Sequence, residues 1–295
     1  MTEDQAPRTS TDGGYETEPV LVADDRWAAL GDVWTIGRTE YRLAVKNRWA
    51  VALTGIFAAF SLGLLTFSGS SVGPEGAQRI LGSLTVLAVY LVPLAALAFG
   101  YDAIVGAEDE GWLQALFALP VARWRVAVGA YVGRSIALAS AVIIGFGISG
   151  VILARDVGIG AWPGFIAFLL GATGLALVFL AIAVMVSTIA KAKTHALGGV
   201  LLVWAWFVLV HDLLALGVIA AFQLPDLALE AMVVTNPAGV FRVLVLNALD
   251  ASGDAGFASV MAATGLSPVV LGVAMVAWIA VPLGLAAVLI DRRRV

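Results

Sequence analysis

Four carboxylates lie in a short stretch between two long apolar segments, at Asp102, Glu108, Asp109 and Glu110. The run from Tyr101 to Leu113 contains all of them. Ionised carboxylates form strong hydrogen bonds with the basic side chains of a partner protein. An acidic loop between two apolar segments therefore predicts a docking site for a cytosolic protein.

The residue patterns that supply an active site are missing from the sequence. A phosphate-binding loop ends in Gly-Lys-Ser/Thr, but none of the three lysines in this chain follows a glycine. The His-Glu-x-x-His zinc helix and the Gly-x-Ser-x-Gly nucleophile turn are also absent. Cysteine is absent too, which excludes disulfides and thiolate ligands. We therefore expect a protein that is not an enzyme and that binds no metal or cofactor of its own.

The composition is that of a membrane protein. Of the 295 residues, 61% are hydrophobic and 13% are charged, whereas a soluble domain has about 45–50% apolar and about 25% charged residues. We therefore expect an all-α integral membrane protein. The net charge of −4 combines an acidic N-terminal segment with basic flanks of the membrane spans, so it indicates no nucleic-acid partner. Six spans are predicted, at residues 49–68, 80–100, 126–154, 161–190, 196–222 and 268–290.

Basic residues are concentrated on one side of these spans. They precede the first and third spans, separate the fourth from the fifth, and follow the sixth. The opposite side has only Arg79, Arg155 and Arg242. Because loops rich in Lys and Arg stay in the cytoplasm, we expect a multi-pass plasma-membrane protein whose termini and acidic loop are cytoplasmic.

The chain before the first span divides into two parts. Residues 1–25 are polar and lack apolar periodicity, which predicts an acidic, disordered tail. Residues 26–48 alternate aromatic and aliphatic with charged residues, which predicts an amphipathic helix on the membrane surface, although a polar extension of the first span also fits. Residues 49–295 then form the six-helix membrane domain. The charged residues of the interfacial helix are Arg38, Glu40, Arg42, Lys46 and Arg48.

The last loop on the outer side, residues 223–267, is long for a connector. After Asn236 and Pro237, apolar residues recur at helical spacing, which predicts an amphipathic helix that begins near the proline. Either a connector that rests on the membrane or an element that docks a partner fits this pattern. The apolar residues are Val240, Phe241, Leu244, Val245, Ala248 and Leu249.

Three ionisable residues fall inside predicted spans, where burial is costly. Arg134 lies early in the third span, and we expect its guanidinium to extend to the cytoplasmic interface. His211 and Asp212 lie deeper, in the fifth span, where Asp212 either forms a hydrogen bond across a helix interface or lines a pathway. The Gly129-x-x-x-Gly133 pattern permits the close approach of another helix.

The segment from Glu108 to Arg123 reads Glu-Asp-Glu-Gly-Trp-Leu-Gln-Ala-Leu-Phe-Ala-Leu-Pro-Val-Ala-Arg. It resembles the permeases of type 2 ATP-binding-cassette exporters, which have an acidic residue, Gly-Thr-Leu, Leu-Leu and Pro-Val/Leu-x-Arg at this point. In that family the segment is a coupling helix seated in a groove of the ATPase subunit, and Trp112 stands here in place of the usual Thr. The family's N-terminal amphipathic helix is matched by residues 36–40 and 46–49.

The resemblance implies a set of residues that couple the chain to the ATPase. The carboxylates would pair with basic residues around the groove, while four apolar members, Trp112, Leu113, Leu116 and Phe117, would be buried there as anchors. The whole set is Asp102, Glu108, Asp109, Glu110, Gly111, Trp112, Leu113, Leu116, Phe117, Pro120 and Arg123.

Four further stretches narrow the resemblance. Residues 97–106 and 207–213, together with Asn236-Pro237 and Phe241-Arg242, are similar to the permeases of the nitrous-oxide-reductase maturation system. This resemblance implies a homodimer, surrounded by membrane lipids, with two cytosolic ATPases that hold ATP and Mg²⁺. It also implies a periplasmic β-helical protein that serves copper-site assembly in the reductase.

Several functions fit these observations. The five Met and two His residues form no line across the spans, and a copper route needs such ligands at helical spacing. Mechanical transmission to an outer partner is therefore preferred over copper conduction. A type 2 exporter of a lipid or other small hydrophobic compound is the alternative, and a membrane anchor or an ion-coupled carrier is a third. Neighbouring genes for a β-helical periplasmic protein and a copper chaperone would favour the maturation system.

Overall fold

The computed structural model describes residues 25–67, 74–111, 113, 122–157, 162–222, 224–249 and 265–293. Regular structure in these ranges is entirely helical. The predicted acidic tail lies outside them except for its last residue. Four of the predicted coupling residues also lie outside the described residues, and these are Trp112, Leu116, Phe117 and Pro120.

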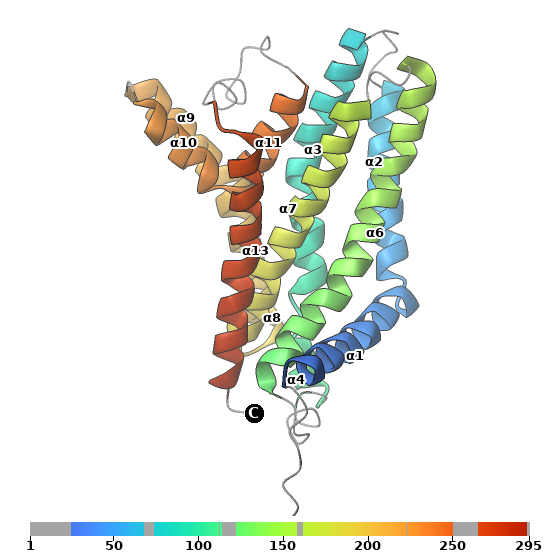
Figure 1. Ribbon diagram of the computed structural model, residues 1–295, viewed down its shortest axis with the longest axis vertical. Helices are drawn as coiled ribbons and strands as arrows, with labels where there is room; N and C mark the ends of the chain where they lie inside the picture. Colours follow the sequence, from blue (N-terminus) through green and yellow to red (C-terminus); the bar gives the residue numbers. More distant parts are fainter. Residues whose placement is uncertain are drawn as a thin grey trace, which may run out of the picture.

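Six helices in the described ranges are long and apolar enough to cross a membrane, which confirms the predicted all-α integral membrane architecture (Figure 1). Helices of this length satisfy every internal backbone hydrogen bond within lipid. The fifth span is continuous but contains a π-helical turn, η2, between two α-helical parts. The spans are α2 (Trp49–Phe67), α3 (Pro74–Gly100), α6 (Arg123–Val157), α7 (Trp162–Ile189), α8–η2–α9 (Lys193–Ala205, Trp206–Val210 and His211–Ala221) and α13 (Pro268–Asp291).

Helix α7 is the centre of the bundle. It packs against α3, α6, α11 and α13, and 61% of its membrane window is buried, the largest share among the six spans. A row of aromatic rings crosses the core beside it: Phe57 of α2 lies 5.2 Å from Phe146 of α6, which lies 5.2 Å from Phe168 of α7. Such pairs add about 0.5–1.5 kcal/mol each beyond simple burial. The row therefore ties three spans together.

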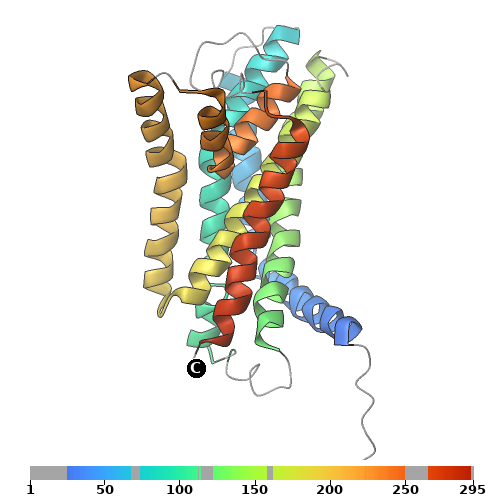
Figure 2. The same ribbon diagram turned by 60° about the vertical axis from the view of Figure 1, so that its left-hand side comes forward.

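Figure 2 shows the fifth span at the edge of the bundle, and only 11% of its membrane window is buried. Helix α1 (Asp25–Lys46), the short α4 (Val105–Asp109) and the last described residues share one end of the bundle, which we call the inner end. Helices α10 (Asp226–Val234) and α11 (Pro237–Ala248) lie at the opposite, outer end.

Helix α1 packs closely against α6 through three glycines. A Cβ atom on Gly133 would lie 2.2 Å from the carbonyl oxygen of Gly37, and one on Gly129 would lie 2.7 Å from the Cβ of Ile36. The pattern at Gly129 and Gly133 thus serves contact with the N-terminal helix. The two helices α1 and α2 meet at a sharp turn, where Arg48 has a positive φ of 61°.

The predicted amphipathic helix after Asn236 is present, and its apolar face packs into the bundle. Helix α11 does not lie on the surface, because Val240, Phe241 and Val245 are fully buried. It packs against α7, α13 and α3 and meets α10 at an angle of 111°. The same apolar periodicity fits a surface helix and a buried one, so the pattern could not distinguish them.

Candidate functional site

The acidic segment after α3 folds into a tight turn followed by α4. This short helix ends at Asp109, and two residues later Gly111 has a φ of 76°, in the left-handed region, with its amide donating to the carbonyl of Glu108 at 2.9 Å. Glycine adopts this conformation at little cost and commonly terminates helices in this way. Gly111 therefore fixes the direction in which the chain leaves α4.

Asp102 is bound within the chain. Its Oδ1 accepts a hydrogen bond from Nη1 of Arg134 at 2.6 Å, while Nε of Arg134 donates to Oε2 of Glu40 at 3.1 Å. Nη1 of Arg134 also donates to the Phe99 carbonyl. Arg134 reaches these inner-end residues from within α6, and its side chain is 15% exposed and held between α1 and the end of α3. A paired guanidinium avoids the cost of an isolated buried charge.

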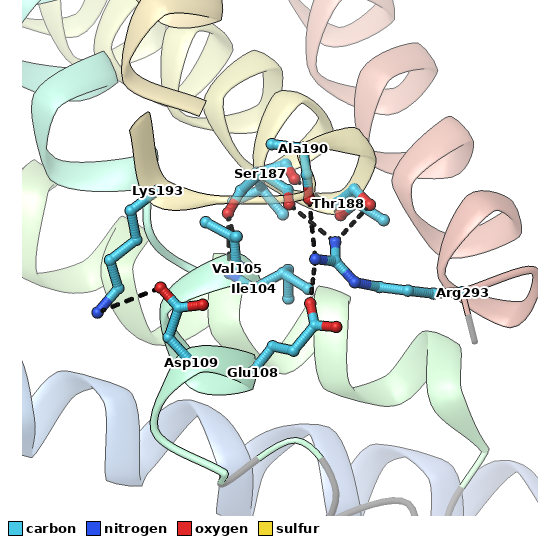
Figure 3. Close-up of polar contacts among 10 residues, drawn as sticks. Ile104, Val105, Glu108, Asp109, Ser187, Thr188, Ala190, Lys193 and Arg293 are labelled. Carbon is cyan, nitrogen blue, oxygen red and sulfur yellow. Dashed lines mark hydrogen bonds and ion pairs between the residues drawn. The ribbon is translucent and has the colours of Figure 1, made fainter. Parts of the chain in front are cut away.

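Glu108 is bound within the chain as well. Its carboxylate pairs with the guanidinium of Arg293, close to the C-terminal end of α13 (Figure 3). Beside this pair, the Ser187 hydroxyl of α7 accepts hydrogen bonds from the amides of Ile104 and Val105 at 3.0 and 3.1 Å. Amides at the start of a helix lack intrahelical partners, so Ser187 acts as a cap supplied by another helix. Helix α4 is thus attached to α7 and α13.

The other two carboxylates face outward from α4. The side chains of Asp109 and Glu110 are 46% and 68% exposed, and each lies near Nζ of Lys193, at 3.9 and 3.7 Å. Exposed ion pairs at such distances contribute little to stability. Asp109 and Glu110 are therefore available to a basic surface of another protein.

Two other predicted coupling residues make contacts within this chain. Leu113 is fully buried in the core of this chain, so the expectation that it anchors in a partner's groove was wrong. Arg123, at the start of α6, donates from Nη1 to the carbonyls of Arg293 at 3.0 Å and Asp291 at 3.4 Å. In the described part of the coupling segment, Asp109 and Glu110 thus form a small exposed surface, while the neighbouring residues are bound within this chain.

The basic residues predicted for the interfacial helix are exposed in α1 and in the turn after it. They are Arg38, Arg42, Lys46 and Arg48. Glu40 differs from them, because it faces α6 and binds Arg134. A second ion pair, between Asp32 and Arg125 at 2.6 Å, joins the same two helices. One face of α1 therefore binds the bundle while its basic residues are left on the other.

A buried polar cluster lies in the outer half, where His211 and Asp212 meet α11. Asp212 Oδ2 lies 2.6 Å from Nη2 of Arg242. The Asn236 side chain is fully buried, and its Nδ2 lies 3.0 Å from His211 Nδ1, 3.3 Å from Asp212 Oδ1 and 3.0 Å from the Phe207 carbonyl. Of the two roles weighed for Asp212, the geometry is that of hydrogen bonding across a helix interface.

Sequence reasoning missed several residues of these two sites. Arg293 belongs to a basic triplet that was interpreted only as an orientation signal, and Ser187 has no distinguishing pattern. Arg242 could have been found, because a lone arginine on an apolar helix and a lone aspartate in a span are natural partners. In the described ranges, no group of three His, Cys, Asp or Glu side chains is placed to hold a metal ion.

The fold and the inner-end segment define a class of protein. A family model described as ABC-2 family transporter protein matches residues 34–295, and the chain belongs to this family. It is thus a permease subunit of an ABC transporter. The protein named "Probable ABC transporter permease protein NosY" of Stutzerimonas stutzeri is 35% identical over 275 residues, covering 90% of this chain and 99% of the relative. Its namesake in Pseudomonas aeruginosa is also 35% identical, covering 88% and 98%.

Proposed function

We propose that this permease transmits the work of a cytosolic ATPase to a protein on the outer side of the membrane. The ATPase, which holds ATP and Mg²⁺, binds the inner end around Asp109 and Glu110, so both termini are cytoplasmic. The observation that carries the proposal is the acidic segment at α4. Its carboxylates at Asp109 and Glu110 are exposed, and Ser187 and Arg293 attach the segment to α7 and to the end of α13.

The attachment of α4 supports mechanical transmission. A displacement of α4 acts on α7 through Ser187 and on α13 through Arg293. Both helices reach the outer end: α7 packs against α11, and Nε1 of Trp278 in α13 donates to the Val234 carbonyl of α10 at 2.9 Å. Packed helices move as rigid bodies, so movement at the inner end reaches α10 and α11.

The particular process is the assembly of the copper site of nitrous oxide reductase. Support comes from the resemblance at residues 97–106 and 207–213 and from two relatives whose identity extends over nearly their whole length. In this proposal two copies of the chain form a homodimer, and a β-helical periplasmic protein binds at the outer end near α10 and α11. Copper is handled by that partner and does not cross this chain.

Co-purification tests whether the ATPase binds at the inner end. The cytosolic ATPase partner is expected to co-purify with the chain in detergent. The double substitution Asp109→Lys/Glu110→Lys should abolish this, because two like-charged contacts replace two attractive ones. Asp226→Lys, a charge reversal at an exposed residue of the outer end, is the matched control and should co-purify normally. Retention of the ATPase by the double variant would place the docking surface elsewhere.

Liposomes that contain only the permease and the ATPase test whether copper crosses this chain. We expect no ATP-dependent copper flux across their membrane. Such a flux would overturn mechanical transmission. ATP-dependent movement of a labelled lipid in the same liposomes would support the alternative, an exporter of a lipid or small hydrophobic compound.

A further inference from the structure

Arg293 binds the last turn of α7 as well as Glu108 (Figure 3). Its Nη1 donates to the carbonyls of Thr188 at 2.7 Å and Ser187 at 3.1 Å, and its Nη2 donates to the Ala190 carbonyl at 2.8 Å. Nη2 also pairs with the Glu108 carboxylate. Two nitrogens of a single guanidinium therefore contact four oxygens from two elements.

These carbonyls are at the end of a helix, where no further amides follow to bind them. A cation at this position satisfies the free carbonyls and interacts favourably with the negative end of the helix dipole. The planar fork of arginine can reach several acceptors at fixed angles, which the single ammonium of lysine cannot. The Arg293 side chain is only 10% exposed, so solvent screens these contacts weakly.

The backbone of Arg293 is held from a third direction. Nη1 of Arg123, in the first turn of α6, donates to the Arg293 carbonyl at 3.0 Å. Arg293 directly follows the end of α13 at Asp291 and Arg292. The inner ends of α6, α7 and α13 thus meet at one residue, and α4 joins them through Glu108.

We infer that Arg293 is a positioning residue for ATP coupling: it converts displacement of α4 into displacement of α7 and α13. This inference rests on the proposed function. The docking surface at Asp109 and Glu110 does not include Arg293, so the ATPase should still bind when Arg293 is removed. Helix α4 would then be attached to α7 mainly through Ser187, and its movement would reach the spans incompletely.

The test uses the full chain and its ATPase in nanodiscs. The natural chain has no cysteine, so Leu227→Cys, at a side chain that is 75% exposed, gives a single reporter on α10, the helix whose last residue accepts the hydrogen bond from Trp278. Two quantities are measured: the affinity for the ATPase, and the change in maleimide labelling rate between the nucleotide-free state and the ATP–vanadate state.

In the reporter background, Arg293→Ala should leave ATPase affinity within about twofold and reduce the nucleotide-dependent change in labelling by about fivefold or more, a typical size for coupling between sites. Arg293→Lys should recover part of the change. Glu108→Ala removes the link between Arg293 and α4 but leaves Arg293 bound to the carbonyls at the end of α7. This variant should also lose the nucleotide-dependent change in labelling. Arg292→Ala removes an exposed neighbouring arginine and should behave as the unsubstituted reporter chain.

Three results would overturn the inference. One is that Arg293→Ala and Glu108→Ala match Arg292→Ala in both measurements. Another is that Arg293→Ala lowers ATPase affinity and transmission in proportion, as general loss of structure would. The third is failure of the unsubstituted chain to bind any ATPase, which would also refute the proposed function; the first two results would refute this inference alone.

Discussion

Nη2 of Arg242 in α11 lies 2.6 Å from Oδ2 of Asp212 in the fifth span, and both side chains are largely buried at 14% and 20% exposure. This ion pair joins a peripheral span to the core of the outer end. Breaking one partner of a buried pair leaves the other charge without compensation. The pair therefore determines how firmly the fifth span is held.

Substitution of either partner should destabilise the protein strongly. Asp212→Asn or Arg242→Gln alone should cost about 3–5 kcal/mol, whereas the double variant should cost less than the sum because no unpaired charge remains. Thermal unfolding followed by tryptophan fluorescence measures this, since the chain has nine tryptophans. Arg155→Gln, at an exposed arginine of α6, is the control. Additive costs would show that the two residues act independently.

The contact between α1 and α6 predicts opposite effects for two glycines of one helix. Gly133→Ala should cost about 1–3 kcal/mol, because the new Cβ meets the Gly37 carbonyl at 2.2 Å. Gly147→Ala has no atom within 4 Å of its Cβ and should be neutral or stabilising by up to about 1 kcal/mol. Trypsin cleavage after Lys46 should accelerate only in the first variant. Equal cleavage rates would contradict this packing.

Arg134 should tolerate neither removal nor replacement by lysine. Arg134→Ala leaves Glu40 and Asp102 without a cation, and a cost of about 1–3 kcal/mol is expected, because the Asp102 side chain is 41% exposed and partly screened by solvent. Arg134→Lys keeps the charge but cannot hold both carboxylates and the Phe99 carbonyl with one fork, so its unfolding temperature should lie between those of the natural protein and Arg134→Ala. An unchanged unfolding temperature for Arg134→Lys would show that charge alone suffices.

Gly111 allows a matched pair of substitutions at the end of α4. Asparagine tolerates a positive φ, whereas a β-branched residue is strained there by about 1–2 kcal/mol. Gly111→Asn should therefore keep its affinity for the ATPase, and Gly111→Val should lose about tenfold, which corresponds to 1.4 kcal/mol. Binding measured by fluorescence anisotropy distinguishes them. Equal loss in both variants would implicate side-chain bulk and not backbone conformation.

Hydropathy predicted the six spans within a few residues, because crossing lipid demands about 20 apolar residues and leaves few alternatives. Periodicity also predicted α11, but not its burial, since Phe241 faces a partner on α7 that no local pattern reveals. The pairs of Arg134 with Glu40 and of Arg293 with Glu108 join residues far apart in the sequence. Charge next to a span indicates orientation equally well whether the residue is free or paired, so tertiary structure was needed to find these partners.

The π-helical turn at Trp206–Val210 has a consequence for comparing related chains. The amide of His211 donates to the carbonyl of Trp206, five residues back, so this turn holds one residue more than an α-helical turn. Deleting a single residue there would leave composition and hydropathy almost unchanged. Five π-helical residues turn about as far around the helix axis as four α-helical ones, so the shortened segment would close into a regular α-helical turn, and His211 and Asp212 would still face Asn236. A one-residue gap in an alignment at this point would therefore mark the loss of the wide turn and not a different outer face of the span.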